Sequence, residues 1–253
     1  MSRSHALGLC AAMFITSSAL AAGWECKPGS FGTGGSALRI EERKVTESFH
    51  GVSVRGSMCV EYVQGPQVSI RLEGEPEMLS QVETVVEKGA LVIGEKRGFS
   101  WPRAWNNKPL RAIVTAPSLD SLAVAGSGDL VAAKWAGDTL RTAVAGSGDI
   151  RVEGMEAKAV SAAISGSGDI RLAGKTDSVK ASVAGSGDID TSRLAANDVS
   201  VKIAGSGDAK VWAQKELVAS IAGSGDVGYY GDAQVKRKVA GNGSVKRLGD
   251  RPN

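Results

Sequence analysis

The sequence predicts an all-β fold, a single-stranded β-helix (solenoid) built from coils of about 18–20 residues. Three observations lead to this fold class. A Gly-Ser-Gly-Asp tetrapeptide recurs at nearly constant spacing in the second half of the chain, apolar residues stand at fixed even offsets around each copy, and the first half alternates apolar and polar residues as half-buried strands do. We expect one domain over residues 39–247, in which a β section (39–116) continues into repeat coils (117–247).

The first 21 residues have the pattern of a secretory signal peptide. Arg3 gives a small positive region, residues 6–20 form an apolar run, and Ala-Leu-Ala at 19–21 fits a cleavage site. We therefore expect an exported protein, in the periplasm, at the cell surface or outside the cell. Residues 22–38 are rich in Gly and Ser, which is typical of a flexible leader. No later stretch offers the roughly 20 apolar residues that a membrane-spanning helix needs.

Cleavage after the signal would remove Cys10 and leave Cys26 and Cys59, an even number in an oxidising compartment. A disulfide between Cys26 and Cys59 is the prediction, and the alternative is two unrelated cysteines with Cys59 buried in a strand. The mature chain has one histidine, His50, and no Cys-x-x-Cys, so we expect neither a catalytic cysteine nor a transition-metal site. Lysines and arginines are interspersed with acids, which argues against nucleic acid as a partner.

The section before the repeats predicts strands and one hairpin. Apolar residues alternate at Val52, Val54, Val60 and Tyr62, and again from Val68 to Leu72. Lys88-Gly89 predicts a hairpin turn between strands on either side, although Glu, Met, Leu and Gln over 76–87 also suit a short helix. Residues 98–109 contain prolines, asparagines and two tryptophans, which predicts a loop, and a further strand follows at about 110–117.

Aligning the copies on their first glycine shows that each tetrapeptide is a corner between two short strands. These first glycines are Gly126, Gly146, Gly166, Gly185, Gly205 and Gly223, with a degenerate seventh copy at Gly241. Two residues before them stand Val124, Val144, Ile164, Val183, Ile203, Ile221 and Val239. Four residues after them stand Leu130, Ile150, Ile170, Ile189, Ala209, Val227 and Val245. Even offsets place both columns on the inward face, so stacked coils would share one continuous core.

Glycine suits such a corner because it enters positive φ cheaply and lets neighbouring coils turn in register. We expect the serine and aspartate to hydrogen-bond the backbone of their own turn. A phosphate-binding loop is excluded, because that loop occurs once, opens a helix and is followed by Lys-Ser/Thr, whereas these six copies have strands on both sides.

The same alignment stacks six carboxylates in one column: Asp129, Asp149, Asp169, Asp188, Asp208 and Asp226. Like charges about 4.8 Å apart repel by roughly 1 kcal/mol per pair even in water. Backbone hydrogen bonds and a partial ladder of cations that includes Arg151, Arg171 and Lys210 would offset this repulsion. Bound Ca²⁺ is the alternative, since carboxylate oxygens suit it, although the spacing differs from that of calcium-binding nonapeptide repeats. We expect no other cofactor.

Small residues fill the outward positions just before each corner, namely Ala125, Ala145, Ser165, Ala184, Ala204, Ala222 and Ala240. Such a flat strip is either packed under other segments of the chain or offered to a flat partner. We expect the N-terminal strands to cover it.

The segments ERKVTESFHGVSVRGSMCVEYVQG and LSQVETVVEKGALVIGE, the serial GSGD corners and the closing YYGDAQVKRKVAGNGSV together resemble the GIN domain, described as the putative auto-transporter adhesin head domain. The resemblance covers nearly all of residues 39–247. It implies an exported bacterial protein with a right-handed β-helix and no established molecular activity.

Three functions are compatible with these observations. The first is a non-enzymatic envelope or surface protein used for adhesion or scaffolding. The second is a carbohydrate- or cation-binding module that uses the aspartate column or Trp101 and Trp105, with a glycan or an envelope protein as partner; lid-like packing over the core is the alternative role of these tryptophans. The third and weakest is a polysaccharide-active enzyme, because the carboxylates are periodic and no pair stands apart.

Overall fold

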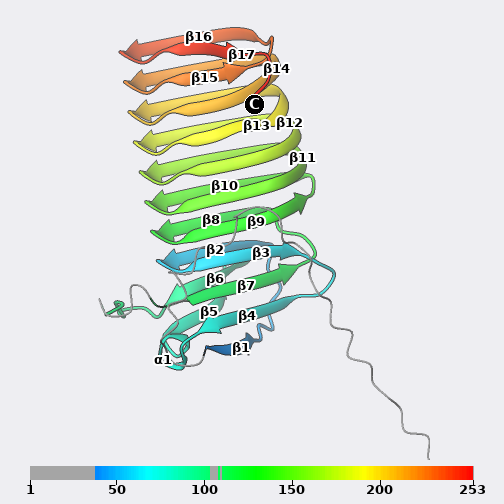
Figure 1. The fold of residues 1–253 in the computed structure, drawn as a ribbon, viewed down its shortest axis with the longest axis vertical. Helices are drawn as coiled ribbons and strands as arrows, with labels where there is room; N and C mark the ends of the chain where they lie inside the picture. The colour runs from blue at the N-terminus through cyan, green and yellow to red at the C-terminus, as the bar shows by residue number, and fades with distance from the viewer. Residues whose placement is uncertain (1–37, 103–107, 109, 253) are drawn as a thin grey trace, which may run out of the picture.

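A computed structural model describes residues 38–102, 108 and 110–252. Figure 1 shows a tall stack of parallel coils, with the chain progressing from the antiparallel end near β1 to β16 and β17. The strands are β1 (Arg39–Arg43), β2 (Gly51–Gly56), β3 (Cys59–Gln64), β4 (Ser69–Gly74), β5 (Val82–Glu87), β6 (Ala90–Glu95), β7 (Leu110–Ala116), β8 (Ser121–Gly126), β9 (Asp129–Ala136), β10 (Thr139–Gly146), β11 (Asp149–Gly166), β12 (Ile170–Gly185), β13 (Ile189–Gly205), β14 (Ala209–Gly223), β15 (Val227–Tyr230), β16 (Gln234–Gly241) and β17 (Val245–Gly249). The predicted β-solenoid is confirmed.

The inward columns of the repeats form the core. Val144 lies opposite Ile164 in the next coil, and Ile164 lies opposite Val183 in the coil after that. All three side chains are buried, as are Ile150 and Ile170 in the column beyond the corner. Because side chains alternate across a strand, the apolar residues of each coil meet those of its neighbours and the polar residues face out.

A coil without the GSGD tetrapeptide precedes the six copies and belongs to the β section that continues into them. β2 pairs in parallel with β8, which places Gly56 opposite Gly126, and β3 pairs with β9, which places Cys59 opposite Asp129. The corner of this coil reads Gly-Ser-Met-Cys at 56–59. Its apolar pattern was visible in the sequence, but Met and Cys replace the Gly and Asp that mark the other corners.

The order of coils along the stack also differs from their order in the chain. β2 pairs with β6 on one side and with β8 on the other, and β3 pairs with β7 and β9 in the same way. The coil formed by β2 and β3 is therefore inserted between two coils that follow it in sequence. Beyond β6 and β7, the antiparallel strands β1, β4 and β5 close this end of the solenoid, as the lower part of Figure 1 shows.

The predicted hairpin is confirmed: β5 and β6 pair antiparallel around Lys88 and Gly89, whose φ angles are 52° and 79°. Both values lie in the left-handed region that two-residue hairpin turns require. The competing helix is limited to α1 (Pro76–Leu79), which buries Met78 and Leu79.

None of the described N-terminal strands packs over the strip of small residues, so the expectation that these strands cover it is wrong. Ala145, Ala184 and Ala204 are exposed. The N-terminal strands extend the same sheet by edge pairing, with Arg55 opposite Ala125, rather than forming a layer above it. Strand pairing satisfies the backbone hydrogen bonds of β2, and a second layer over the strip would not.

The C-terminal end of the solenoid is open among the described residues, since β16 pairs with β14 and has no partner on its other edge. Val239 is 38% exposed, whereas Ile221 in the coil below is 1% exposed. Two arginines take inward positions in this last coil: Arg237 lies opposite the buried Ala219, and Arg247 opposite Tyr229. Each guanidinium donates a hydrogen bond to a backbone carbonyl oxygen, Arg237 to that of Val245 and Arg247 to that of Gly231.

Candidate functional site

The GSGD corners allow the backbones of successive coils to pack closely and to hydrogen-bond with one another. The carbonyl oxygen of Gly126 accepts hydrogen bonds from the backbone N–H groups of Ser147 and Gly148 in the next coil, at 2.9 and 3.0 Å. Gly146 has φ of 130°, and a Cβ added there would lie 2.3 Å from the same oxygen. A Cβ on Gly148 would lie 2.0 Å from the Gly128 oxygen. Both glycines are therefore required by the close approach of the preceding coil.

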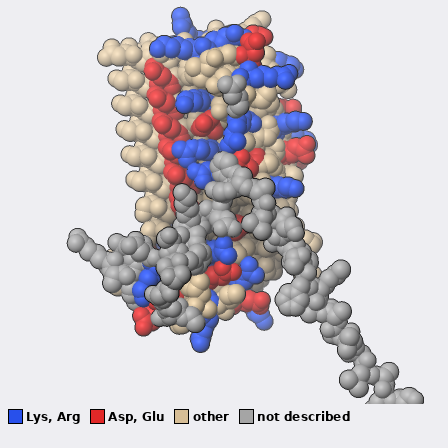
Figure 2. Space-filling view, viewed as in Figure 1, with Lys and Arg blue, Asp and Glu red and all other residues tan. Residues whose placement is uncertain are grey.

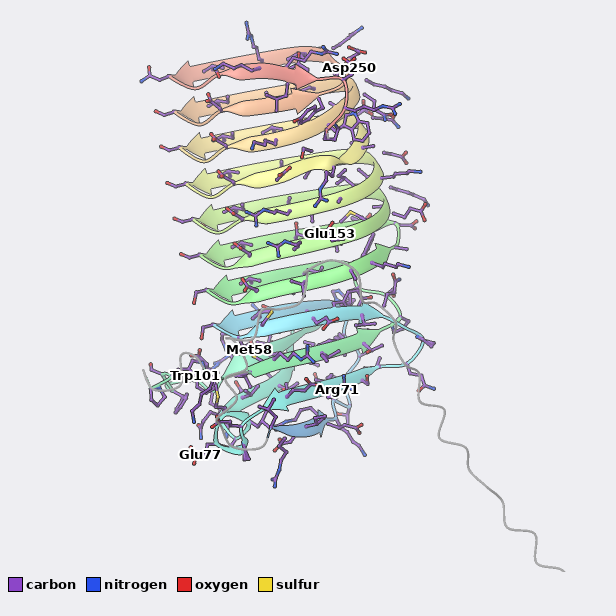
Figure 3. All side chains as sticks on the ribbon, viewed as in Figure 1. Met58, Arg71, Glu77, Trp101, Glu153 and Asp250 are labelled. Atoms are coloured by element: carbon purple, nitrogen blue, oxygen red, sulfur yellow. The ribbon has the colours of Figure 1, made fainter. Side chains whose placement is uncertain are left out.

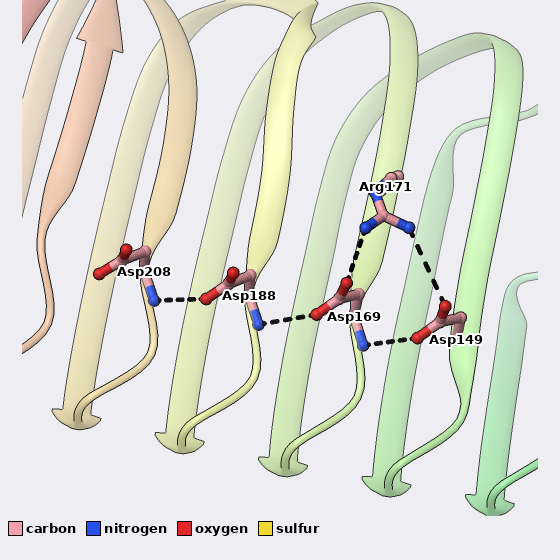
Figure 4. Close-up of polar contacts among 5 residues, drawn as sticks. All are labelled: Asp149, Asp169, Arg171, Asp188 and Asp208. Atoms are coloured by element: carbon pink, nitrogen blue, oxygen red, sulfur yellow. Dashed lines mark hydrogen bonds and ion pairs between the residues drawn. The ribbon is translucent and has the colours of Figure 1, made fainter.

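The aspartates form a hydrogen-bonded ladder along the stack (Figure 4). The Asp149 carboxylate accepts the backbone N–H of Asp169 at 2.9 Å, and Asp169 accepts that of Asp188 at 3.2 Å. The ladder continues through Asp208 to Asp226, which accepts both the N–H and the hydroxyl of Ser244. The expectation of bonds within the same turn is wrong, because each carboxylate binds the backbone of the next coil.

One arginine bridges two aspartates of the column. The Arg171 guanidinium lies 2.7 Å from an Asp169 oxygen and 3.9 Å from an Asp149 oxygen (Figure 4). Figure 2 shows the carboxylate column running along the solenoid with Lys and Arg side chains beside it. Backbone N–H donors and these cations thus act together against the repulsion between stacked carboxylates.

The two ends of the column differ in their electrostatics. At Asp129, burial raises the pKa of the carboxyl, the Asp149 carboxylate raises it further, and an N–H of Asp149 and the Arg151 charge oppose the rise. At Asp226, the hydroxyl and then the N–H of Ser244 lower the pKa of the carboxyl. The ionised form is therefore disfavoured at Asp129 and favoured at Asp226.

Replacing Asp188 tests whether the column serves as a set of acceptors. Asp188→Ala is expected to lower the free energy of unfolding by about 1 kcal/mol, because the Asp208 N–H loses its acceptor at 2.8 Å. Asp188→Asn keeps an acceptor oxygen and removes a charge between Asp169 and Asp208, so it should be neutral or stabilising. Urea unfolding of both variants measures this. An Asn variant as unstable as the Ala variant would show that the charge itself is needed.

The raised pKa of Asp129 predicts a pH-dependent effect. A carboxyl whose folded pKa exceeds its unfolded pKa destabilises the fold once both states are ionised, and this penalty disappears as pH falls below the unfolded value. Asp129→Asn should therefore raise the melting temperature near pH 7 and change it much less near pH 3, which lies below the usual aspartate pKa of about 3.9. Thermal melts at both values test this, with Asp226→Asn as the opposite control: its lowered pKa predicts a larger loss of stability near pH 7 than near pH 3. An equal gain at both pH values for Asp129→Asn would contradict the electrostatic origin.

Within the described ranges, no group of three or more His, Cys, Asp and Glu side chains is arranged to hold a metal ion. Calcium binding by the aspartate column stays a prediction, which melting curves with calcium and with chelator would test.

Of the two tryptophans singled out from the 98–109 loop, the structure describes Trp101. Trp101 is half-buried, packs against the hydrophobic core and meets Phe99 edge to face at a centroid distance of 5.3 Å. Figure 3 places it at the N-terminal end of the solenoid, far from Asp250 at the other end. Trp105 lies outside the described residues. This packing favours the lid-like role for Trp101.

The other residues singled out from the sequence were the two cysteines. Cys59 begins β3 and is half-buried. Cys26 lies outside the described residues, so the disulfide between them stays a prediction.

A column of large side chains that sequence analysis missed lies on the outer face of the last coils. Trp212 lies opposite Tyr230 in the next coil. Leu248 has the same offset from its own corner, but Gly249 is the register partner of Tyr230, and the Leu248 side chain lies over Gly228. Both rings are half-buried, and Leu248 is 47% exposed. Counting seven residues from the first glycine of each corner would have found these three side chains, although the register partner of Trp212 in the preceding coil is Ala195.

Two shallow hollows mark the described surface. One, of about 440 Å³, lies at the edge opposite the corners between Lys134 and Lys175, where Gly154 and Gly174 leave room. The other, of about 280 Å³, lies on the strip of small residues around Ala143 and Ala145. Gln64 and Glu156 also line the first hollow, whereas small and apolar residues line the second.

These features define a β-solenoid protein in which the repeated residues hold coils together and the outer faces are left open. The sequence model of the family described as "Putative auto-transporter adhesin, head GIN domain" matches residues 48–233, and the chain belongs to this family.

Three solved structures share the fold. A structure described as a putative adhesin from Bacteroides fragilis has a TM-score of 0.77 at 20% identity, covering 85% of this chain and 98% of its own. A structure described as a putative lipid binding protein from Parabacteroides distasonis has a TM-score of 0.67 at 24% identity, covering 83% and 96%. A putative adhesin from Parabacteroides merdae has a TM-score of 0.60 at 20% identity, covering 85% and 98%. No curated protein sequence matches the chain. Over the described part of the chain, no helix has the length and apolar character needed to cross a membrane.

Proposed function

We propose that this protein is an exported, non-enzymatic protein of the cell envelope or cell surface, whose solenoid serves adhesion or scaffolding. Membership of the GIN family supports this proposal, as do the solved structures of the same fold that are described as putative adhesins. The signal-like pattern of residues 1–21 supports export.

The observation that carries the proposal is that different residues of each coil hold the stack together and form its exposed outer face. Both corner glycines are occupied by contacts with the neighbouring backbone, and the aspartates accept backbone N–H groups. The outer face before the corners has no such task and is exposed along its length at Ala125, Ala145, Ala184, Ala204 and Ala222. A flat, regular, exposed face is suited to binding an extended partner.

Export is tested by expressing the full chain in a bacterial host and fractionating the cells. The expected result is a protein outside the cytoplasm whose mass corresponds to cleavage after residue 21. An uncleaved protein retained in the cytoplasm would contradict the proposal.

Adhesion is tested by binding of the exported protein to intact bacterial cells and envelope fragments. Arginines at two strip positions, Ala145→Arg with Ala184→Arg, should reduce binding by about tenfold, because their long charged side chains prevent close contact with a flat surface. Ser147→Arg with Ser186→Arg adds the same charge at exposed corner positions in the same coils and serves as the matched control. Equal binding by both double variants would exclude the strip as the adhesive face.

The non-enzymatic part is tested separately with a panel of polysaccharides. No turnover is expected. Reproducible turnover that is abolished by Asp149→Ala or Asp169→Ala would overturn it.

A further inference from the structure

We propose that the outer face of the last coils, formed by Trp212, Tyr230, Lys210 and Lys246, binds a linear glycan chain that runs parallel to the solenoid axis. This proposal goes beyond the proposed function, since it assigns a ligand class to a face other than the strip of small residues.

The aromatic side chains are displayed outward rather than used in the core. Along β14, Ala209, Val211 and Ala213 are buried, so Trp212 between them points out of the coil. Neither Trp212 nor Tyr230 belongs to the buried core or to the side chains that pack against it among the described residues, whereas the neighbouring Tyr229 does. An outward pair of large rings is unusual on this solenoid, since the register partners before Trp212 are Ala195, Lys175 and Glu156 in successive coils.

The position of the rings suits a sugar chain. Trp212 and Tyr230 are register partners in adjacent coils, which are about 4.8 Å apart. That spacing is comparable to the length of one sugar unit, so successive rings of a glycan could lie over successive coils. Aromatic residues supply a rigid apolar surface for the C–H face of a sugar together with a polar edge.

Polar groups flank the aromatic column on one side. Lys210 and Lys246 are exposed two residues before Trp212 and Leu248, and Gly228 stands between them in the intervening coil. The Lys246 charge contributes to lowering the pKa of the Asp226 carboxyl, which places that carboxylate nearby. Ammonium donors and carboxylate acceptors beside an aromatic surface can pair with sugar hydroxyls, and this mixture of charges suits a hydroxyl-rich chain better than a lipid bilayer.

The rings of Trp212 and Tyr230 are held in place by the turns that follow them. A Cβ on Gly231 would lie 3.4 Å from the Trp212 ring, and one on Gly249 would lie 3.8 Å from the Tyr230 ring, so each ring lies over a glycine of the following turn. Arg247 fixes these turns, since it donates to the Gly231 carbonyl at 2.9 Å and pairs with Asp232 and Asp250. Rings held in this way lose little conformational freedom on binding.

The experiment measures binding of the exported protein to a neutral β-linked glucan hexasaccharide and to a uronic-acid hexasaccharide, by calorimetry and tryptophan fluorescence. Binding of either sugar is expected, with Trp212→Ala and Tyr230→Ala each weakening it by about tenfold, and Lys210→Ala with Lys246→Ala weakening the uronic-acid sugar more than the neutral one. Trp101→Ala is the matched control and should bind as the wild type does. Far-ultraviolet circular dichroism checks folding, and Trp212→Phe, which keeps a ring, should retain most of the binding if Trp212→Ala does not fold.

Three outcomes would overturn the proposal: no binding of either hexasaccharide, a loss caused equally by Trp101→Ala, or Trp212-dependent binding to anionic phospholipid vesicles in place of sugars. The strip variants Ala145→Arg and Ala184→Arg separate this result from the adhesion test, because they should leave hexasaccharide binding unchanged. Failure of sugar binding with intact, strip-dependent adhesion would remove the glycan site and keep the proposed function.

Discussion

Gly168→Ala is expected to destabilise the protein by about 3 kcal/mol or more, one of the largest effects of a single methyl group in this chain. A Cβ at this position would lie 2.0 Å from the Gly148 carbonyl oxygen and 3.0 Å from the Gly148 carbonyl carbon and nitrogen. These atoms belong to the backbone of the preceding coil, so no side chain can move aside. The coils would have to separate at the corner, where Gly168 also donates a hydrogen bond to the Gly146 carbonyl.

Gly154→Ala is the matched control, because it adds the same methyl group in the coil below. Its Cβ would lie 3.3 Å from the nearest backbone atom, the Ala133 oxygen, at an exposed position. Loss of chain entropy in the unfolded state should make this variant neutral or slightly more stable. Thermal melts should place Gly168→Ala roughly 10 °C below wild type and Gly154→Ala close to it. Equal melting temperatures for the two variants would show that the corner tolerates a side chain.

Arg237→Ala is expected to promote end-to-end association of the protein, at least tenfold more strongly than in the wild type. Arg237 occupies an inward position whose counterparts in the preceding coils include Ala162, Ala181, Val201 and Ala219, all buried. We expect a charge at this position, at the open end of the solenoid, to prevent another strand from continuing the core. Alanine would restore the apolar column beside the unpaired edge of β16 and leave the exposed Val239 available for contact.

Lys238→Ala is the control, since it removes the same charge from the adjacent outward position of the same strand. Sedimentation velocity over a range of concentrations should show larger species for Arg237→Ala alone. Identical behaviour of the two variants would contradict the role of the inward arginine. Arg247, which stands in the inward column on the other side of the last coil, is expected to act in the same way.

Much of the fold could be predicted because the repeated tetrapeptide allows the coils to be aligned with one another within this one sequence. Val144 and Ile150 were predicted to point inward from their offsets alone, and both are buried. The hairpin at Lys88-Gly89 was equally local, since its two positive φ angles are a property of the turn. The coil with the corner at 56–59 was missed because its Met58 and Cys59 break the tetrapeptide while its register with β8 and β9 keeps the fold.

The candidate surfaces were less predictable. The aspartate column was visible in the sequence, but its hydrogen bonds connect each coil with the next, as for Asp188 and the Asp208 N–H. Trp212 and Tyr230 are 18 residues apart, and the positions become neighbours only through the pairing of β14 with β15. Exposure of the small-residue strip likewise depended on the pairing of β2 with the edge of β8 rather than with a layer above the strip.

The sequence by itself determined which side chains of each coil face inward, where the corners fall and why glycine occupies them, because side-chain alternation and backbone conformation are local properties. Only the tertiary structure decided the order of the coils, the partner of each carboxylate and the faces left open. Backbone N–H and C=O groups pair equally well with many strands, so the choice among them depends on packing across the whole stack rather than on any one segment.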